Sequence, residues 1–386
     1  KNNYYNDTLV PMFFEVLNKP INKRIERFQE GAFGAIPYLN GGLFSPLPED
    51  YYKLDRETGS IIPGVVHVPD EWIKAFFELL DTYHFTVDEN TSVDVDLSID
   101  PEMLGRIFEN LLARINPETG ETVRKNTGSF YTPREIVEYM VDESLIQYIK
   151  LKTGVEVDKI KALVSYDLND DSKHPLTNSE KVSVINSLGS VKILDPACGS
   201  GAFPIGILQK IVYILQRIDP EAKQWFDSQV ADTPPELRHL IETEFKHKNF
   251  DYIRKLGVIR ESIFGVDIQP IATEIARLRC FLTLIVDERV SDAEPNRGIY
   301  PLPNLDFKFV TANTLMKLNI PATVSEDQTG LFEDVSGIDE LSSLRDEYFN
   351  SQSIERDSLK LQFSQAQNRM LQNMIANHRH GYSDVT

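Results

Sequence analysis

The sequence predicts an α/β fold in which a parallel sheet follows a helical N-terminal region and precedes a helical tail. Three short apolar segments typical of strands alternate along the chain with two long helical patterns. The first of these segments runs directly into a glycine turn and a helix, "ILDPACGSGAF". Alternation of this kind is typical of parallel sheets with right-handed crossovers, so we expect the three strands to lie in one sheet.

Size and composition set the first limits. At 386 residues the chain is long enough for two or three structural units. No apolar run approaches the ~20 residues of a membrane helix and no signal-peptide pattern opens the chain, so we expect a cytoplasmic protein without a membrane partner. The two cysteines, Cys198 and Cys280, exclude a disulfide framework and a cysteine-built zinc site.

The net charge of the chain indicates which binding partners it favours. The chain has 40 basic and 59 acidic side chains, a formal net charge of −19. Such a surface repels a polyanion at long range, so if the substrate is a nucleic acid this chain is not its main contact surface. The chain also begins at Lys1 without an initiating Met, which predicts a processed product or a fragment of a longer protein.

Residues 1–125 predict a helical region rich in loops. "YLNGGLF" (38–44) is a glycine turn between apolar anchors. In "DPEMLGRIFENLLARI", Asp100 caps a helix and Pro101 occupies its first turn. The apolar residues of that helix recur on one face, at Leu104, Ile107, Phe108, Leu111, Leu112 and Ile115. The polar segment 116–128 then indicates a domain boundary.

A second domain, expected over residues 126–325, opens with "GSFYTPREIVEYMV". Thr132 and Glu135 have the spacing of a capping box, and Pro133 takes the first helical position. Apolar residues at helical spacing follow, so a helix is predicted there. Residues 168–190 are polar and predict a loop before the first strand.

The predicted sheet consists of "VKILD" (191–195), "SIFGVDI" (262–268) and "DFKFVTAN" (306–313). A helix from Pro204 to Arg217 follows the first strand. A second helix begins at Pro270, and its apolar face comprises Ile271, Ile275, Leu278, Leu282 and Ile285. Residues 326–386 predict a helical extension without a strong apolar stripe.

The glycine turn at Gly199 and Gly201 allows the backbone to approach a ligand, although a tight strand-to-helix turn needs no ligand. Asp267 ends the next strand, where a carboxylate can accept hydrogen bonds from both ribose hydroxyls of a nucleoside. The gap between turn and acid is much longer than the ~20 residues of a dinucleotide fingerprint, which argues against a nicotinamide cofactor. No Gly-Lys-Ser/Thr follows the turn, which disfavours a triphosphate.

Asp195, at the strand end of the turn, indicates the charge of the ligand. A carboxylate there repels a diphosphate and attracts an ammonium group. S-adenosylmethionine carries such a group, together with a ribose for Asp267. Its carboxylate fits the N-terminus of the helix beginning near Thr132, where N–H groups and the helix dipole favour an anion. Thr132 as a plain helix cap is an equally good interpretation, and the two roles are compatible.

Four ordered motifs carry a resemblance to a known family: "TGSFYTPREIV", "ILDPACGSGAF", "IFGVDIQPIATEIARLRCFLTLIVDE" and "FKFVTANTL". They are similar to the S-adenosylmethionine-binding half of adenine-specific (N6) DNA methyltransferases. The best match is to the large single-chain, type IIG-like enzymes of prokaryotic restriction–modification and phage-defence systems. "YLNGGLF" and "LGRIFENLL" resemble the helical region that precedes the methyltransferase in those proteins. The resemblance covers residues 38–316 and implies a Rossmann-like methyltransferase core within residues 126–325.

The resemblance implies a role for each matching residue. The methionine end of the cofactor would be contacted by Phe130, Tyr131 and Thr132. The glycine loop around it would be lined by Asp195, Ala197, Cys198, Gly199 and Gly201. Asp267 would bind the ribose hydroxyls and Ile268 would pack on the adenine ring. Asn313 stands where many relatives have an Asp that accepts from the adenine amino group, a bond that an amide oxygen can also accept.

The catalytic motif of that family is absent from the chain. Its members hold a flipped adenine with an Asn/Asp/Ser-Pro-Pro-aromatic motif on the fourth strand. The only Pro-Pro pair here, in "ADTPPELRH" (231–239), precedes the strand that carries Asp267. We therefore expect a fragment that binds the cofactor and is inactive alone. The main surface for double-stranded DNA, and a target-recognition or nuclease domain, would belong to other parts of the full-length polypeptide.

Two other functions stay open: a methyltransferase for a protein or small-molecule amine, and a non-catalytic defence scaffold that retains the fold. No metal site is expected, because "HRH" (378–380) is isolated and the acidic run 81–102 is typical of a solvated loop. A metal-dependent nuclease would use a Pro-Asp and a Glu-x-Lys sequence on paired strands. Here Pro69-Asp70 and Glu221 with Lys223 are predicted at helices or helix starts. In the segment 245–260, Lys and Arg alternate with Phe and Tyr, which is the best candidate for nucleic-acid contact beside a solvated helix face.

Overall fold

A computed structural model describes residues 3–39, 44, 53–54, 61–62, 68–82, 132–165, 175–230, 249–288, 290–292, 294–299, 301–315, 336–351 and 353–377. The chain divides into two compact units. The sheet unit comprises Val68–Tyr300 and Lys308–Thr314, and the helical unit comprises Lys1–His67, Pro301–Phe307 and Leu315–Thr386. The expected boundaries near residues 125 and 325 lie outside the described residues, so the three-domain division stays a prediction.

The sheet unit contains the predicted parallel sheet. Its strands are β3 (Ile193–Asp195), β4 (Ile263–Asp267) and β5 (Phe309–Thr311), paired in the order β3-β4-β5. Both pairs are parallel, with Asp195 opposite Gly265 and Asp267 opposite Thr311. The three predicted strands are confirmed, each shorter than the segment expected for it.

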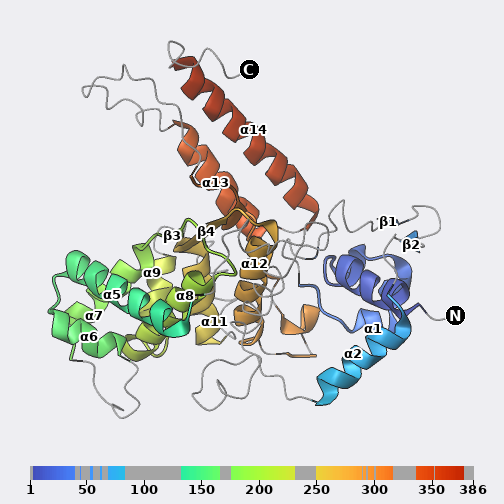
Figure 1. Ribbon diagram of the computed structural model, residues 1–386, viewed down its shortest axis with the longest axis horizontal. Coiled ribbons are helices and arrows are strands. Elements are labelled where there is room, and N and C mark those ends of the chain that lie inside the picture. The colour runs from blue at the N-terminus through green and yellow to red at the C-terminus, as the bar shows by residue number, and fades with distance from the viewer. Residues whose placement is uncertain are drawn as a thin grey trace, which may run out of the picture. The chain divides into compact units, whose positions relative to one another are not determined.

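Helices pack against these strands (Figure 1). The two predicted crossover helices are α8 (Ala202–Ile218) and α12 (Pro270–Ile285), and α11 (Phe250–Glu261) packs against both. A cluster around α8 and α11 comprises α5 (Arg134–Thr153), α6 (Val157–Val164), α7 (Asn178–Ser190) and α9 (Lys223–Gln229). The unit also contains α2 (Asp70–Thr82) and a short 3₁₀ turn, Pro295–Gly298. The fully buried side chains of the cluster include Ile149, Leu163, Leu188, Ile205 and Trp225.

Two local predictions in this unit are wrong. Helix α5 starts at Arg134, with Pro133 in an extended conformation at its cap and no side-chain cap bond, so Thr132 and Glu135 form no capping box. The capping box lies instead at Thr177 and Glu180, where it starts α7 inside the segment predicted as a loop. The loop was predicted because most residues of 168–190 are polar. Helix α7 forms there because it buries the apolar residues Val184, Ile185 and Leu188.

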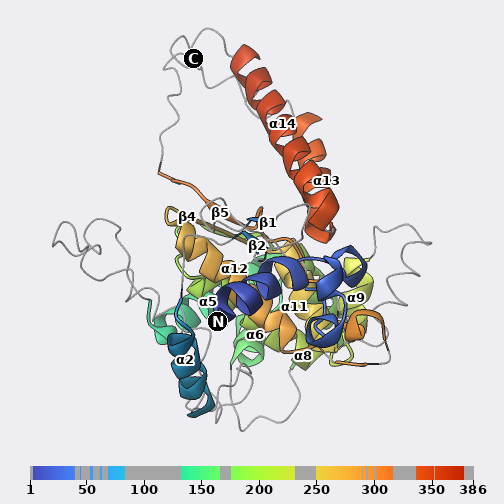
Figure 2. The same ribbon diagram turned by 90° about the vertical axis from the view of Figure 1, so that its right-hand side faces the viewer.

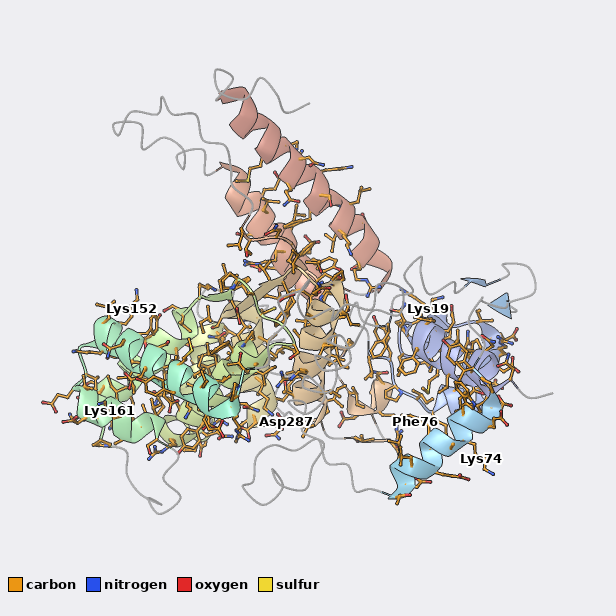
Figure 3. The ribbon with its side chains drawn as sticks, in the orientation of Figure 1. Lys19, Lys74, Phe76, Lys152, Lys161 and Asp287 are labelled. Atoms are coloured by element: carbon orange, nitrogen blue, oxygen red, sulfur yellow. The ribbon has the colours of Figure 1, made fainter. Side chains whose placement is uncertain are left out.

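Two cations of the segment 245–260 differ from expectation, and Lys246 and Lys248 lie outside the described residues. In α11, Arg254 and Lys255 are 2% and 8% exposed. The Arg254 guanidinium donates to the carbonyls of Asp219 and Pro220. Lys255 pairs at 2.8 Å with Asp287, which lies just beyond α12 and is labelled in Figure 3. These two side chains are therefore structural cations of the interior and not a surface for nucleic-acid phosphates.

The helical unit begins with short helical segments: π-helical Tyr5–Leu9 and Met12–Val16, 3₁₀ Ile21–Lys23 and Glu26–Phe28, and α1 (Gly31–Gly34). Arg24 is buried among them and donates to the carbonyls of Lys19, Phe33 and Ile36. A two-stranded antiparallel pair, β1 (Lys53–Leu54) and β2 (Ile61–Ile62), belongs to the same unit.

The tail forms a helical hairpin, α13 (Ser336–Asn350) and α14 (Ser353–Asn377), as Figures 1 and 2 show, and confirms the expected helices there. The Phe307 ring packs against Tyr348 and Phe363 of this hairpin, with ring centroids 4.5 and 4.1 Å apart. Phe307 thus belongs to the helical unit, and β5 begins at Phe309 and not at Asp306. Among the helices that the structure describes, none combines the length and apolar character needed to cross a membrane.

Candidate functional site

Two carboxylates meet at one edge of the sheet. β3 ends at Asp195 and β4 ends at Asp267, and because the strands are parallel and adjacent, both side chains lie at the carboxyl ends of the strands. Thr311 ends β5 at the same edge. In open α/β sheets ligands bind outside this edge. The two acids identified from the sequence are thus brought together by the fold.

A glycine turn connects β3 to α8 beside these acids. Gly199 and Gly201 have φ angles of +53° and +90°, which L-residues with a side chain rarely adopt. A Cβ atom on Gly201 would also lie 3.1 Å from the Cβ of Ala276 in α12. The turn therefore needs glycine for both its conformation and its packing, and the N-terminus of α8 opens directly from it.

Asp267 holds this turn in place. One carboxylate oxygen accepts from the backbone N–H of Gly199 at 2.9 Å, and the other accepts from the N–H of Gln269 at 2.8 Å. Each carboxylate oxygen has two lone pairs, so both can accept one more hydrogen bond from a ligand. The residue predicted to bind a ribose is also a structural anchor of the loop.

Asp195 has one oxygen in use and one without a partner. Its Oδ1 accepts from the N–H of Ala197 at 3.1 Å, whereas its Oδ2 is buried and accepts no hydrogen bond. Burial raises the pKa of this carboxyl above its ordinary value, and the nearby charge of Asp267 raises it further. A buried acceptor without a donor indicates a place where a ligand donor or cation fits.

Cys198 forms part of the wall of the site. Its N–H donates to the carbonyl of Val266 at 2.9 Å, and the residue is only 4% exposed. Burial raises the pKa of the thiol to about 12, with further contributions from Asp195 and Asp267. The thiol therefore keeps its proton at neutral pH, which fits a wall residue and not a nucleophile.

This protection can be tested with a thiol reagent. Burial also raises the pKa of Cys280 to about 12, so neither cysteine is expected to react with a disulfide reagent at neutral pH while the chain is folded. Both should react at once in denaturant, measured by the absorbance of the released thiolate. Rapid labelling of Cys198 in the folded protein would contradict the buried-wall interpretation.

The remaining predicted residues surround the same edge. Ile268 follows Asp267 with 56% of its surface exposed, and Asn313, two residues after β5, is exposed as well. Thr314 donates its hydroxyl to the carbonyl of Pro196 at 3.0 Å, which brings the segment after β5 to the glycine turn. Phe130 and Tyr131 lie outside the described residues.

The start of α5 lies at the same end of the unit. A Cβ atom on Gly206 in α8 would be 2.7 Å from Val137, and Asp142 pairs with Lys210 at 2.8 Å. Positions advance along both helices in the same direction, so the N-termini of α5 and α8 lie at one end. Thr132, half-buried just before α5, is therefore near the glycine turn.

Sequence reasoning missed Arg279. It lies in α12, is 3% exposed, and donates from Nη1 to the carbonyl of Ser200 in the glycine turn at 3.1 Å. The signal in the sequence is its spacing: it stands four residues after Ile275 and three after Ala276, on the buried face of the helix. An arginine on an apolar face indicates a specific buried acceptor.

This chain resembles a known protein. It is 30% identical over 321 residues to a protein of Methanocaldococcus jannaschii whose name proposes a type II restriction enzyme and methyltransferase. No protein-family model matches the chain, and no solved structure matches it. The similarity covers 81% of this chain and 24% of the relative, so the chain spans about a quarter of the length of the protein that it resembles.

Proposed function

We propose that this chain is the S-adenosylmethionine-binding part of a restriction–modification DNA methyltransferase that methylates adenine at N6. The observation that carries the proposal is the pair Asp195 and Asp267 around a glycine turn, in a chain similar to a protein named as a restriction enzyme and methyltransferase. The strand order supports it, because β5-β4-β3 corresponds to the first half, 3-2-1, of the doubly wound order.

The residues at the site suit this cofactor. The unpartnered, buried Oδ2 of Asp195 suits a cationic ammonium group, and Asp267 has acceptor capacity left for ribose hydroxyls. The exposed Ile268 offers an apolar surface for the adenine ring, and Asn313 an amide for its amino group. Thr132 and the α5 N-terminus would take the carboxylate, with Phe130 and Tyr131 beside it. When bound, S-adenosylmethionine supplies a methyl group on a positively charged sulfur.

The acceptor and the DNA contacts belong to a larger protein in this proposal. The chain contains no Asn/Asp/Ser-Pro-Pro-aromatic sequence to hold a flipped adenine, and its net charge of −19 opposes binding of double-stranded DNA by this chain alone. We therefore propose that the adenine-binding motif, a target-recognition domain and a nuclease act with this chain on one polypeptide. The chain by itself is expected to bind cofactor without transferring a methyl group.

Calorimetric titration tests the cofactor assignment. The chain is expected to bind S-adenosylmethionine and to show no heat of binding with NAD⁺ or ATP, because two carboxylates face the ligand. Incubation with tritium-labelled cofactor and DNA should leave the DNA unlabelled. Binding of a nucleotide in preference to S-adenosylmethionine, or a folded chain that binds none of the three, would contradict the proposal.

The affinity should also depend on pH. Because the pKa of Asp195 is raised above 3.8, this carboxyl takes up its proton at a higher pH than an ordinary aspartate. Attraction for a cation is thus complete well above the raised pKa and is lost as the pH falls through it. Titrations from about pH 8 down to about pH 4 should show affinity falling on the acid side. Asp195→Asn should bind weakly at every pH, and a pH-independent wild type would disprove this role.

A further inference from the structure

Among the described residues, the side chains of three residues far away in the sequence hold the glycine loop, residues 195–201. Asp267 accepts from the Gly199 N–H, and Thr314 donates to the Pro196 carbonyl. The third contact comes from Arg279, whose Nη1 donates to the Ser200 carbonyl at 3.1 Å. The first two contacts lie at the strand ends, and the third comes from the interior of α12.

Arg279 differs from three other buried cations of the sheet unit. Lys210, Arg254 and Lys255 each pair with an aspartate, at 2.8, 2.5 and 2.8 Å. Among the described residues, no carboxylate lies within 4.0 Å of the Arg279 guanidinium, and its Nε is buried without a partner. Burial of a charge without a counter-charge is unfavourable. The hydrogen bond to the Ser200 carbonyl is therefore the contact that distinguishes Arg279 from these three cations.

The contact fixes one peptide group of the loop from both ends. The carbonyl of Ser200 is held by Arg279, and the N–H of the same peptide, on Gly201, donates to the carbonyl of Cys198 at 2.8 Å. A peptide next to glycine rotates easily because glycine lacks a Cβ. Rotation of this peptide would reverse its carbonyl and its N–H at the entrance to α8, beside the two carboxylates.

We propose that Arg279 is a positioning residue for the cofactor: by holding the Ser200 carbonyl, it keeps the glycine loop in the conformation that admits S-adenosylmethionine. The inference rests on the proposed function for the identity of the ligand. Helix α12 would then both pack on the sheet and hold the glycine loop through Arg279. Arg279 touches the loop and not the ligand, so its loss should change the order of the loop as well as the affinity.

The test compares two substitutions of Arg279 with a matched control. Arg279→Gln removes the charge, and Arg279→Lys keeps the charge but loses the planar donor geometry. Arg254→Gln is the control, because Arg254 is equally buried and also donates to backbone carbonyls, at a loop remote from Gly199. Circular dichroism establishes that each variant is folded, calorimetry gives its affinity for S-adenosylmethionine, and hydrogen exchange follows the amides of residues 197–203.

We expect Arg279→Gln to weaken cofactor binding about tenfold or more and to speed amide exchange in the loop, with Arg279→Lys between it and the wild type. Arg254→Gln should lower stability without either effect. Equal affinity and equal loop exchange in both Arg279 variants would overturn the inference. So would an equal loss in the Arg254 control, because the effect would then be one of general stability.

Hydrogen exchange separates this inference from the proposed function. If the wild-type chain binds no S-adenosylmethionine, the cofactor assignment fails, and the exchange of the free loop still decides whether Arg279 holds it. Faster exchange in the Arg279 variants alone would then support the positioning role for another ligand of the same loop. Unchanged exchange would reject it.

Discussion

Replacing Asp267 by Ala is expected to lower the affinity for S-adenosylmethionine by about 100-fold or more. The substitution removes the acceptors of the Gly199 and Gln269 N–H groups, and with them the proposed contacts to the ribose hydroxyls. The two backbone donors are then left without an acceptor at the strand edge. Asp267→Asn should behave similarly, because one of its two positions would present an N–H to a backbone N–H. Calorimetry of both variants beside the wild type measures the loss.

A control is needed for the loss of one negative charge. Asp292→Asn serves this purpose, since Asp292 is 81% exposed and pairs only with Arg297 in the contacts that are described. Its affinity for the cofactor should stay within about twofold of the wild type, as expected for an exposed charge. A folded Asp267→Ala chain that binds as well as the Asp292→Asn control would refute the assignment of Asp267.

Replacing Asp142 by Leu is expected to destabilise the fold by about 3 kcal/mol. Lys210 is 1% exposed and pairs with Asp142 at 2.8 Å, with its ammonium also donating to the carbonyl of Val164 at 3.1 Å. Burial lowers the pKa of Lys210, so its charge is already unfavourable and becomes more so without the carboxylate. The effect falls at the lower end of the usual range because Asp142 is 30% exposed. Urea denaturation measures it.

The double variant Asp142→Leu with Lys210→Met decides between a charge effect and a packing effect. Two apolar residues of similar volume remove the unpaired charge, so most of the lost stability should return. Glu138→Gln is the control on the same helix, because its pair with Arg134 is exposed and should contribute under about 1 kcal/mol. A double variant no more stable than Asp142→Leu alone would show that the ion pair is not the cause.

The sequence predicts those parts of the fold that local patterns determine. The three strands follow from short runs of apolar residues. Helices α8 and α12 follow from the helical spacing of apolar residues after Gly201 and Pro270. All five elements form as expected. Helix α7 was missed, although Thr177 and Glu180 carry the spacing of a capping box. At Thr132 the same spacing gives no such box, because Pro133 takes an extended conformation before the helix. Whether residues with capping-box spacing form the box therefore depends on the conformation of the backbone next to them.

The sequence predicts which residues form the site, but it does not predict the hydrogen bonds between them. Asp195 and Asp267 follow from their positions at strand ends, but the bond from the Gly199 N–H to Asp267 joins residues 68 positions apart. The contact between Arg279 and Ser200 spans 79 positions. Such links depend on the register of β3 against β4 and on the packing of α12, which no local pattern contains. The interior position of Arg254 and Lys255 escaped prediction for the same reason.

The bond between Asp267 and Gly199 has a consequence for the order in which the protein is made. The glycine loop leaves the ribosome well before the residue that holds it, since α9, α11 and β4 are synthesised in between. Until β4 pairs with β3, the loop lacks its acceptor for the Gly199 N–H and has only one of the two carboxylates that face the ligand. A nascent chain that has not reached Asp267 should therefore be unable to retain cofactor.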